Sequence, residues 1–149
     1  MLQGVLQAII AAPIFIIFGA NEVGDSMPII LTALFLFAVG FLFESMADQQ
    51  MKAFKSNPDN SSKIMNEGLW KYSRHPNYFG DFLQWFAIFV LSLSTGSFFG
   101  VIAPAMMLFI FFKLTIRLLE KPQSKKRPGY TQYMDDTNMF FPGPSRSRD

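Results

Sequence analysis

The chain has 149 residues, which is enough for one domain but hardly for two. Half of its residues are hydrophobic and 16% are charged, against about 25% in soluble domains. This composition excludes a disordered chain, a coiled coil and an ordinary nucleic-acid binder. The absence of cysteine and a single histidine, His75, exclude disulfides, thiolate metal sites and a multi-histidine zinc site. The formal net charge is only +2, so any basic character depends on where the charges lie.

Long stretches without charge dominate the chain: residues 1–21, 26–43 and 82–112. The last stretch would be about 46 Å long as one helix, too long for a hydrocarbon core of about 30 Å. It contains the turn-forming run Ser94-Thr95-Gly96-Ser97 near its middle. We therefore predict apolar helical spans over residues 5–20, 27–43, 78–93 and 98–112.

The basic residues all lie on one side of these predicted spans. With the N-terminus inside, the outer links 21–26 and 94–97 contain no Lys or Arg, whereas the central loop and the segment from Lys113 onward hold all thirteen. This is the positive-inside pattern. It predicts a multi-pass membrane protein whose central loop and C-terminus are cytoplasmic.

A soluble helical bundle is the alternative, but residues 9–18 and 31–43 offer almost no polar face. A signal peptide fits poorly, since no basic residue precedes Lys52. The predicted fold class is therefore an all-α integral membrane bundle of about four transmembrane helices with cytoplasmic amphipathic extensions. We predict a single membrane domain over residues 1–142 and a disordered tail over 143–149.

The second predicted span continues as a polar helix to Lys55 and stops at Asn57-Pro58, because the residue before proline avoids helical dihedrals. Glu44, Asp48, Met51 and Lys55 fall on one face of this extension. That face is either solvated, with a weak Asp48–Lys52 pair, or a rim that receives a charged ligand outside the bilayer.

The segment from Gly68 to Asp81 is rich in polar and aromatic residues: Gly-Leu-Trp-Lys-Tyr-Ser-Arg-His-Pro-Asn-Tyr-Phe-Gly-Asp. Pro76 suits the first position of a helix, and the basic residues just before it would meet an anion at that helix N-terminus. Asn77 and Asp81 begin a polar stripe that runs into the apolar span, where an acid is costly unless it is paired or functional. The alternative is a helix cap with Asp81 at the headgroup level, and His75 by itself is as consistent with a structural role.

The C-terminal segment carries the basic cluster Lys125-Lys126-Arg127 and then Tyr130 and Tyr133. These residues either attract anionic lipid or close over a ligand held at the ends of the second and third spans.

Three blocks of residues then carry a family resemblance. They are Leu42-Phe43-Glu44 with Ala47-Asp48 and Phe54-Lys55; the run from Gly68 to Asp81; and Leu119-Glu120-Lys121 with Arg127-Pro128-Gly129-Tyr130, Tyr133 and Phe141-Pro142. On these blocks, over residues 40–142, the chain resembles the DUF1295 membrane proteins. That family belongs with the C-terminal domain of the steroid 5-alpha-reductases and with the sterol reductases.

The resemblance implies an enzyme that transfers a hydride from NADPH to a conjugated C=C bond of a steroid-like or isoprenoid lipid. It places the adenosine and phosphates of the cofactor near Asp48 and Lys55, and the nicotinamide and ribose near Asn77 and Asp81. The walls of the cofactor site would be formed by Tyr78 and by Tyr130 or Tyr133. The cofactor-binding residues it predicts are Glu44, Asp48, Lys55, Arg74, His75, Asn77, Asp81, Arg117, Tyr130 and Tyr133. Tyr78 and Asp81 are the predicted catalytic residues, with no metal. No Gly-x-Gly-x-x-Gly turn occurs, which excludes a Rossmann site.

The chain also departs from that family. Its members are longer and have further N-terminal spans, which in the steroid reductases supply the residues that polarise the substrate carbonyl. Asp135-Asp136 also stands where a basic pair is common. We therefore expect a fragment, a short relative or the partner of another membrane subunit, with a homo-oligomer left open. The alternatives in function are a methyltransferase of the isoprenylcysteine or phospholipid type, which uses S-adenosylmethionine at the same Arg-His-Pro start, and a non-catalytic membrane fragment.

Overall fold

The computed structural model describes residues 11, 14, 15, 17, 19 and 26–146, except the side chain of Arg117. The described residues form helices and turns, and none of them lies in a strand. The all-helical prediction is therefore confirmed for this part of the chain. Most of the predicted span 5–20 lies outside the described residues, although the described positions within it are helical.

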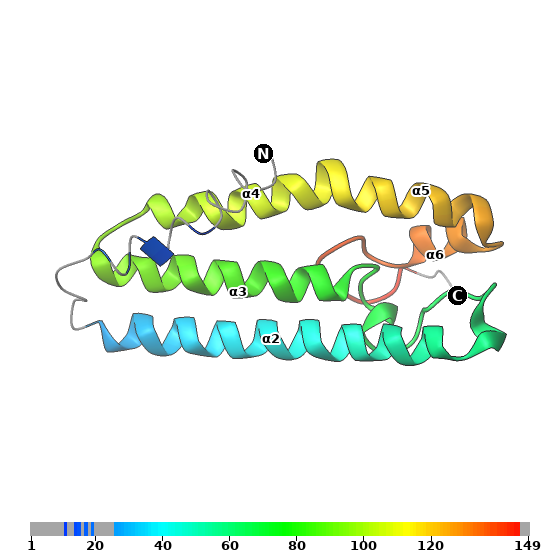
Figure 1. The fold of residues 1–149 in the computed structure, drawn as a ribbon, viewed down its shortest axis with the longest axis horizontal. Helices are drawn as coiled ribbons and strands as arrows, with labels where there is room; N and C mark the ends of the chain where they lie inside the picture. The colour runs from blue at the N-terminus through cyan, green and yellow to red at the C-terminus, as the bar shows by residue number, and fades with distance from the viewer. Residues whose placement is uncertain (1–10, 12–13, 16, 18, 20–25, 147–149) are drawn as a thin grey trace. The chain divides into compact units, whose positions relative to one another are not determined.

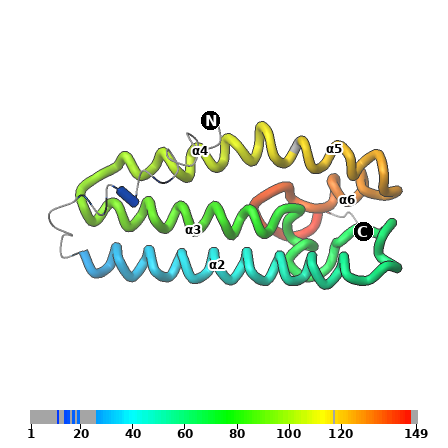
Figure 2. Tube along the Cα trace, in the orientation of Figure 1, coloured from blue at the N-terminus to red at the C-terminus, as the bar shows by residue number. Residues whose placement is uncertain are grey.

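Helix α2 runs from Met27 to Ser56 without a break (Figures 1 and 2). It contains the predicted apolar span and its polar extension, and it ends two residues before Pro58, as the sequence predicts. The chain then makes the 3₁₀ turn η1, Pro58–Asn60, where the Asn57 side chain accepts a hydrogen bond from the Asp59 backbone N–H at 3.0 Å. Asn57 thus both ends α2 and caps the turn that follows.

Helix α3, Pro76–Ser92, begins at the predicted proline. It is preceded by the 3₁₀ turn η2, Gly68–Lys71. Gly68 has φ of 57° and leaves no room for a side chain, because a Cβ there would lie 2.6 Å from Gln50 Oε1. That Gln50 oxygen accepts a hydrogen bond from the Leu69 N–H at 3.0 Å and fixes the loop to α2.

A tight hairpin follows α3, as the Ser-Thr-Gly-Ser run predicts. It consists of η3, Leu93–Thr95, a left-handed Gly96 with φ of 75°, and η4, Phe99–Val101, before helix α4, Ile102–Ile110. Gly100 packs so closely on Ser92 that an added Cβ would overlap the Ser92 hydroxyl. The small residue at position 100 therefore allows the chain to return along α3 (Figure 1).

The helical run that includes α4 does not end at Phe112, where the fourth span was predicted to end. It continues through the π-helical turn η5, Phe111–Thr115, into α5, Ile116–Lys126. The prediction stopped at the first charged residue, Lys113. Charge marks the edge of an apolar stretch but not the end of a helix, since Lys, Arg and Leu are all good helix formers. A short helix α6, Tyr130–Asp136, follows Gly129, whose φ is 81°.

Within the described residues, two helices are long and apolar enough to cross a membrane: Met27–Ser56 and the continuous run Phe99–Lys126. Helix α3, with 17 residues, is at the lower limit of the transmembrane range. Large apolar side chains of α2 are exposed, among them Leu31, Leu34, Phe35, Phe41 and Leu42. Water-soluble proteins rarely expose such a surface.

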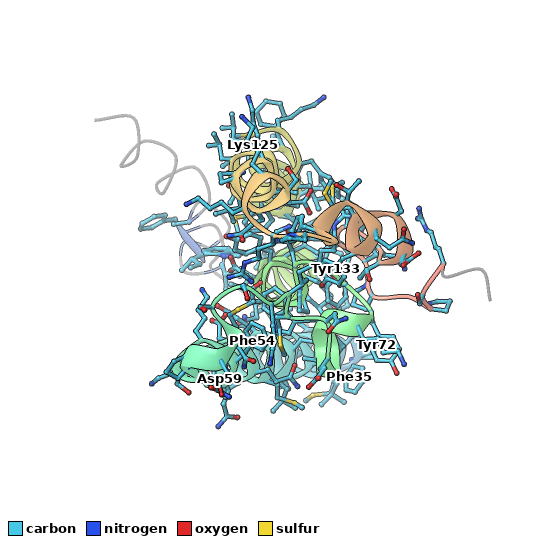
Figure 3. All side chains as sticks on the ribbon, turned by 90° about the vertical axis from the view of Figure 1, so that its right-hand side faces the viewer. Phe35, Phe54, Asp59, Tyr72, Lys125 and Tyr133 are labelled. Carbon is cyan, nitrogen blue, oxygen red and sulfur yellow. The ribbon has the colours of Figure 1, made fainter. Side chains whose placement is uncertain are left out.

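The chain divides into two compact units, Met1–Phe41 with Asp81–Ile110, and Leu42–Gly80 with Phe111–Asp149. In the second unit Phe140 is 2% exposed and its ring meets those of Phe79, Phe111 and Phe112. Tyr133 also lies inside this unit, whereas Asp59 and Lys125 lie at its periphery (Figure 3).

The residues after Pro142 are hydrogen-bonded as far as they are described. Gly143 donates its backbone N–H to Tyr72 O at 3.1 Å, and Arg146 donates to Asp136 O at 2.7 Å. Residues 147–149 lie outside the described residues, so the disordered tail, like the single domain over 1–142, stays a prediction.

Candidate functional site

The Arg74 side chain makes four hydrogen bonds within the second unit. Its Nε donates to Glu120 Oε1 at 2.7 Å and one terminal nitrogen donates to Glu120 Oε2 at 3.3 Å. The other terminal nitrogen donates to the carbonyls of Met134 and Thr137. Arg74 is 8% exposed and Glu120 is 6% exposed. A buried charge is tolerated when it is paired and hydrogen-bonded, and both conditions are met here.

His75 is held by the same carboxylate. Its Nε2 lies 3.0 Å from Glu120 Oε1, and its ring stacks on the Tyr78 ring with centroids 5.4 Å apart. Tyr78 in turn stacks on Phe111 at 4.8 Å. An imidazole bonded to a carboxylate has its hydrogen on the bonded nitrogen, so Glu120 and Tyr78 together fix both the orientation of the ring and the position of its proton.

The C-terminal segment is fastened directly to the start of α3. The Arg74 backbone N–H donates to Asn138 O at 2.9 Å, and the Ser73 hydroxyl donates to Phe140 O at 2.7 Å. Ser73 Oγ also accepts the His75 N–H at 3.1 Å, immediately before α3 begins. Residues that are far apart in the sequence therefore hold the Arg-His-Pro turn in place.

A cavity of about 320 Å³ opens beside this turn, within the second unit. Its walls come from the polar end of α2, the loop after it, the first turn of α3, and α5 and α6. The volume is at the lower end of the range for small-molecule sites. It is therefore large enough for part of a dinucleotide, such as one nucleotide or the nicotinamide portion.

The acidic groups of this cavity already have partners. Asp48 Oδ1 accepts from Asn77 Nδ2 at 3.0 Å, and Glu120, which does not line the cavity itself, is paired with the lining residue Arg74. Lys55, in contrast, makes no hydrogen bond or ion pair with any described residue. Arg127 uses one nitrogen on the carbonyl of Lys63 and keeps further donors. The groups still available are thus mostly cationic donors.

Asn77 adds one acceptor of a different kind. Its Oδ1 is buried and has no hydrogen-bond partner among the described residues. An unpaired buried acceptor costs about 1–3 kcal/mol, so a ligand that donates an N–H or O–H at this point would be stabilised.

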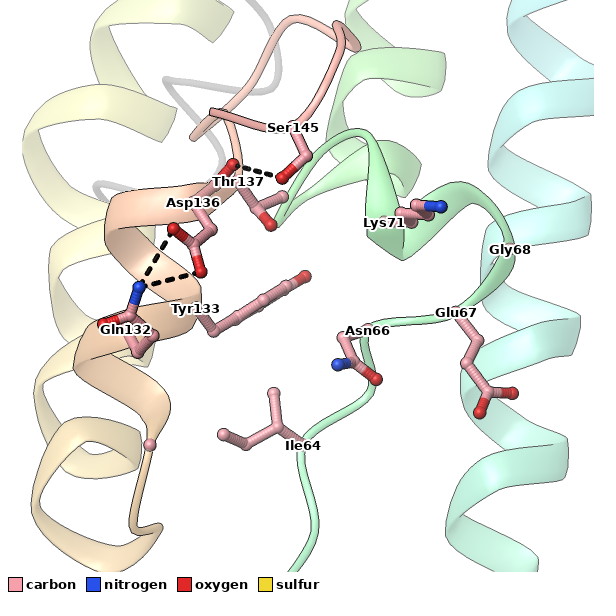
Figure 4. Close-up of a pocket in the computed structure, with 11 residues that line it drawn as sticks. Ile64, Asn66, Glu67, Gly68, Lys71, Gln132, Tyr133, Asp136, Thr137 and Ser145 are labelled. Atoms are coloured by element: carbon pink, nitrogen blue, oxygen red, sulfur yellow. Dashed lines mark hydrogen bonds between the residues drawn. The ribbon is translucent and has the colours of Figure 1, made fainter. Parts of the chain in front are cut away.

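A larger cavity, of about 730 Å³, shares Tyr133 and Ile64 with the first one (Figure 4). Its polar groups largely satisfy one another: Gln132 Nε2 donates to both oxygens of Asp136, and Ser145 Oγ donates to Asp136 O. Its walls include the acids Glu67 and Asp136 against one cation, Lys71. The smaller cavity is therefore the better site for an anionic ligand.

Most of the predicted site residues meet at the smaller cavity. Those that line it are Asp48, Lys55, Arg74, His75, Asn77, Tyr78, Tyr130 and Tyr133. Glu44 does not line it, Asp81 belongs to the other unit, and the Arg117 side chain lies outside the described residues. The roles assigned to all of these residues stay predictions, but Arg74 has its donors occupied by protein groups.

Sequence reasoning did not assign Gln123 to this site and did not find that Glu120 pairs with two residues that line it, whereas Arg127 belongs to the basic cluster that was expected to attract lipid or to close over a ligand. Glu120 is flanked by Lys121 in a basic segment, and nothing in that pattern shows that its partners are Arg74 and His75. One signal was available: an acid on the apolar side of an otherwise basic helix needs a buried partner.

Comparison with known proteins identifies the family of this chain. The profile of the family described as "Protein of unknown function (DUF1295)" matches residues 1–137. The chain belongs to the DUF1295 family. This confirms the resemblance found in the sequence, and no solved structure shows significant similarity to the chain.

Similar curated proteins point to two chemistries. A probable O-methyltransferase, ustE, of Ustilaginoidea virens is 41% identical over 51 residues, which are 34% of this chain and 18% of that protein. The steroid 5-alpha-reductase DET2 of Gossypium hirsutum is 34% identical over 64 residues, 43% of this chain and 25% of that protein. An uncharacterized protein of Schizosaccharomyces pombe is 30% identical over 138 residues, 74% of this chain and 38% of that protein. The chain thus spans well under half the length of these relatives.

Proposed function

We propose that this DUF1295 chain forms the cofactor-binding part of a membrane-embedded, NADPH-dependent reductase that acts on a C=C bond of a steroid-like or isoprenoid lipid. The similarity to a steroid 5-alpha-reductase supports the reaction class. The observation that carries the proposal is the polarity of the smaller cavity, whose acids are paired within the protein while Lys55 and Arg127 remain available.

The residues present fit a dinucleotide phosphate in charge and in hydrogen bonding. Lys55 and Arg127 would hold phosphate oxygens, since charge-assisted hydrogen bonds to ionised groups are the stronger ones. Asn77 Oδ1 would accept an N–H from an amide or amine group of the ligand. When bound, NADPH would supply the hydride. His75 and Tyr78 form an ordered wall beside it.

The membrane setting belongs to the same proposal. The two apolar helices of sufficient length and the one-sided basic residues support a multi-pass chain with its central loop and C-terminus in the cytoplasm. A lipid substrate would then approach from the bilayer. A further membrane subunit, or a second copy of this chain, would be its partner there.

An S-adenosylmethionine-dependent methyltransferase is the second candidate, favoured by the 41% identity to the probable O-methyltransferase. The two cofactors differ in charge: NADPH carries several phosphate charges, whereas S-adenosylmethionine carries a sulfonium cation and one carboxylate. A cavity with two available cations favours the more anionic ligand.

A binding titration separates the two candidates. Trp70 lines the cavity and is 7% exposed, and the chain has one other tryptophan, Trp85. In a Trp85→Phe variant the fluorescence reports Trp70 alone. We expect NADPH to change this emission saturably. A response to S-adenosylmethionine but not to NADPH would replace the reductase by the methyltransferase, and no response to either would favour a non-catalytic fragment.

A further inference from the structure

Two tyrosines of helix α6 line the same cavity but differ in how their hydroxyl groups are used. Tyr130 and Tyr133 lie one helical turn apart, each is 9% exposed, and their ring centroids are 5.8 Å apart. The Tyr133 hydroxyl donates to the carbonyl of Trp70 at 2.6 Å. The Tyr130 hydroxyl makes no hydrogen bond with any residue that the structure describes.

The Tyr130 oxygen is nevertheless not sealed inside the protein. In the described part of the chain, Asn77 Oδ1 is the side-chain atom that is both fully buried and without a hydrogen-bond partner. The Tyr130 oxygen also has no partner there, but it is not fully buried. A buried phenol usually finds a partner for its hydroxyl. In a residue that lines a cavity, a missing protein partner leaves the hydrogen bond for a ligand or for water.

The surroundings decide what kind of ligand atom fits. Burial and the nearby Glu120 carboxylate raise the pKa of Tyr130 to about 12, so at neutral pH the group is a neutral O–H donor. Arg74 and Arg127 are close enough to act on it electrostatically. Arg127 and Lys55 also line the cavity. A donor hydroxyl among cations matches an anionic acceptor oxygen.

We propose that the Tyr130 hydroxyl donates a hydrogen bond to a phosphate oxygen of the bound ligand, and that Tyr133 serves the fold and does not contact the ligand. This inference rests on the proposed function in one respect: NADPH is the main probe of its test because we propose that NADPH is the ligand. It separates two residues that the sequence could only treat as equivalent walls.

The test compares Tyr130→Phe with Tyr133→Phe in the full chain carrying Trp85→Phe, purified in detergent micelles. NADPH affinity is measured from Trp70 emission, and the midpoint of thermal unfolding from circular dichroism. Tyr130→Phe should weaken NADPH binding about tenfold with an unchanged midpoint. Tyr133→Phe should lower the midpoint, because it leaves the Trp70 carbonyl without its donor, and should keep NADPH affinity within about twofold.

Equal losses of affinity in both variants, or no loss in Tyr130→Phe, would overturn the inference while leaving NADPH binding intact. If the unsubstituted chain does not bind NADPH, the proposed function fails, and inorganic pyrophosphate becomes the probe. Weaker pyrophosphate binding by Tyr130→Phe than by Tyr133→Phe would then support the inference alone. Absence of pyrophosphate binding, or a Tyr130 effect seen only with S-adenosylmethionine, would refute the phosphate contact.

Discussion

Arg74 and Glu120 form a buried ion pair, in which the Arg74 Nε donates to Glu120 Oε1 at 2.7 Å across 46 residues of sequence. Glu120 also binds His75, and Arg74 also binds two carbonyls of the C-terminal segment. The pair thus joins the start of α3, helix α5 and the end of α6 with the residue after it. We infer that this pair shapes the cavity by holding its walls, without having to contact a ligand.

Removing one partner of the pair should destabilise the protein strongly. Glu120→Met leaves a buried guanidinium without its counter-ion, which costs about 3–5 kcal/mol. The double variant Arg74→Met with Glu120→Met should recover more than half of this loss, because it removes both charges at similar volume. Unfolding by denaturant, followed by Trp70 fluorescence, measures the effect. Glu67→Gln, at an exposed position, is the control. An equally large loss of stability there would show that the effect of Glu120→Met does not come from breaking the buried ion pair.

Lys55 should contribute to ligand binding through its charge. Lys55→Ala should weaken NADPH binding about tenfold at low salt, and the loss should shrink as added salt screens the exposed ammonium group. The matched control is Lys52→Ala, which removes the same charge from the same helix at a position that does not line the cavity. Equal effects of the two substitutions would mean that the helix acts through its general field and not through a contact.

Stability should decrease at alkaline pH because of Tyr130. Its pKa is raised from 10.0 to about 12, chiefly by burial, so above pH 10 the unfolded chain loses a proton that the folded chain keeps. The contribution is complete below pH 10 and falls between pH 10 and about 12, by up to about 1.4 kcal/mol per pH unit. Burial also raises the pKa of Tyr133, which adds to the same slope. Unfolding free energies measured across this window should fall less steeply in Tyr130→Phe, and an identical slope would contradict the assignment.

The hairpin after α3 should depend on the absence of a side chain at position 100. Gly100→Ala places a Cβ against the Ser92 hydroxyl, and overpacking of this kind costs about 1–3 kcal/mol. Combining it with Ser92→Gly should restore part of the loss in the midpoint of thermal unfolding. Gly19→Ala, where an added Cβ meets no atom of a described residue within 4 Å, serves as the control. A double variant that is as unstable as Gly100→Ala would show that the strain lies elsewhere.

The sequence alone determined the local structure and the composition of the site. Pro76 placed the start of α3, Asn57-Pro58 the end of α2, and the Ser-Thr-Gly-Ser run the hairpin, since each acts through dihedral preferences of neighbouring residues. The resemblance to the DUF1295 family predicted that Asp48, Lys55, His75 and Asn77 share one cofactor site, and all four line the smaller cavity.

Only the tertiary structure decided which of these groups remain available to a ligand. Two such questions are whether Arg74 binds a phosphate or Glu120, and which of Tyr130 and Tyr133 has its hydroxyl free to bind a ligand. Both depend on contacts between residues 46 to 63 positions apart. No local pattern encodes such pairs, because a long-range hydrogen bond is set by the packing of whole helices. The helix also continues past Lys113, where the predicted apolar span ends, because hydropathy shows where a helix leaves an apolar medium, whereas the end of the helix is set by the backbone.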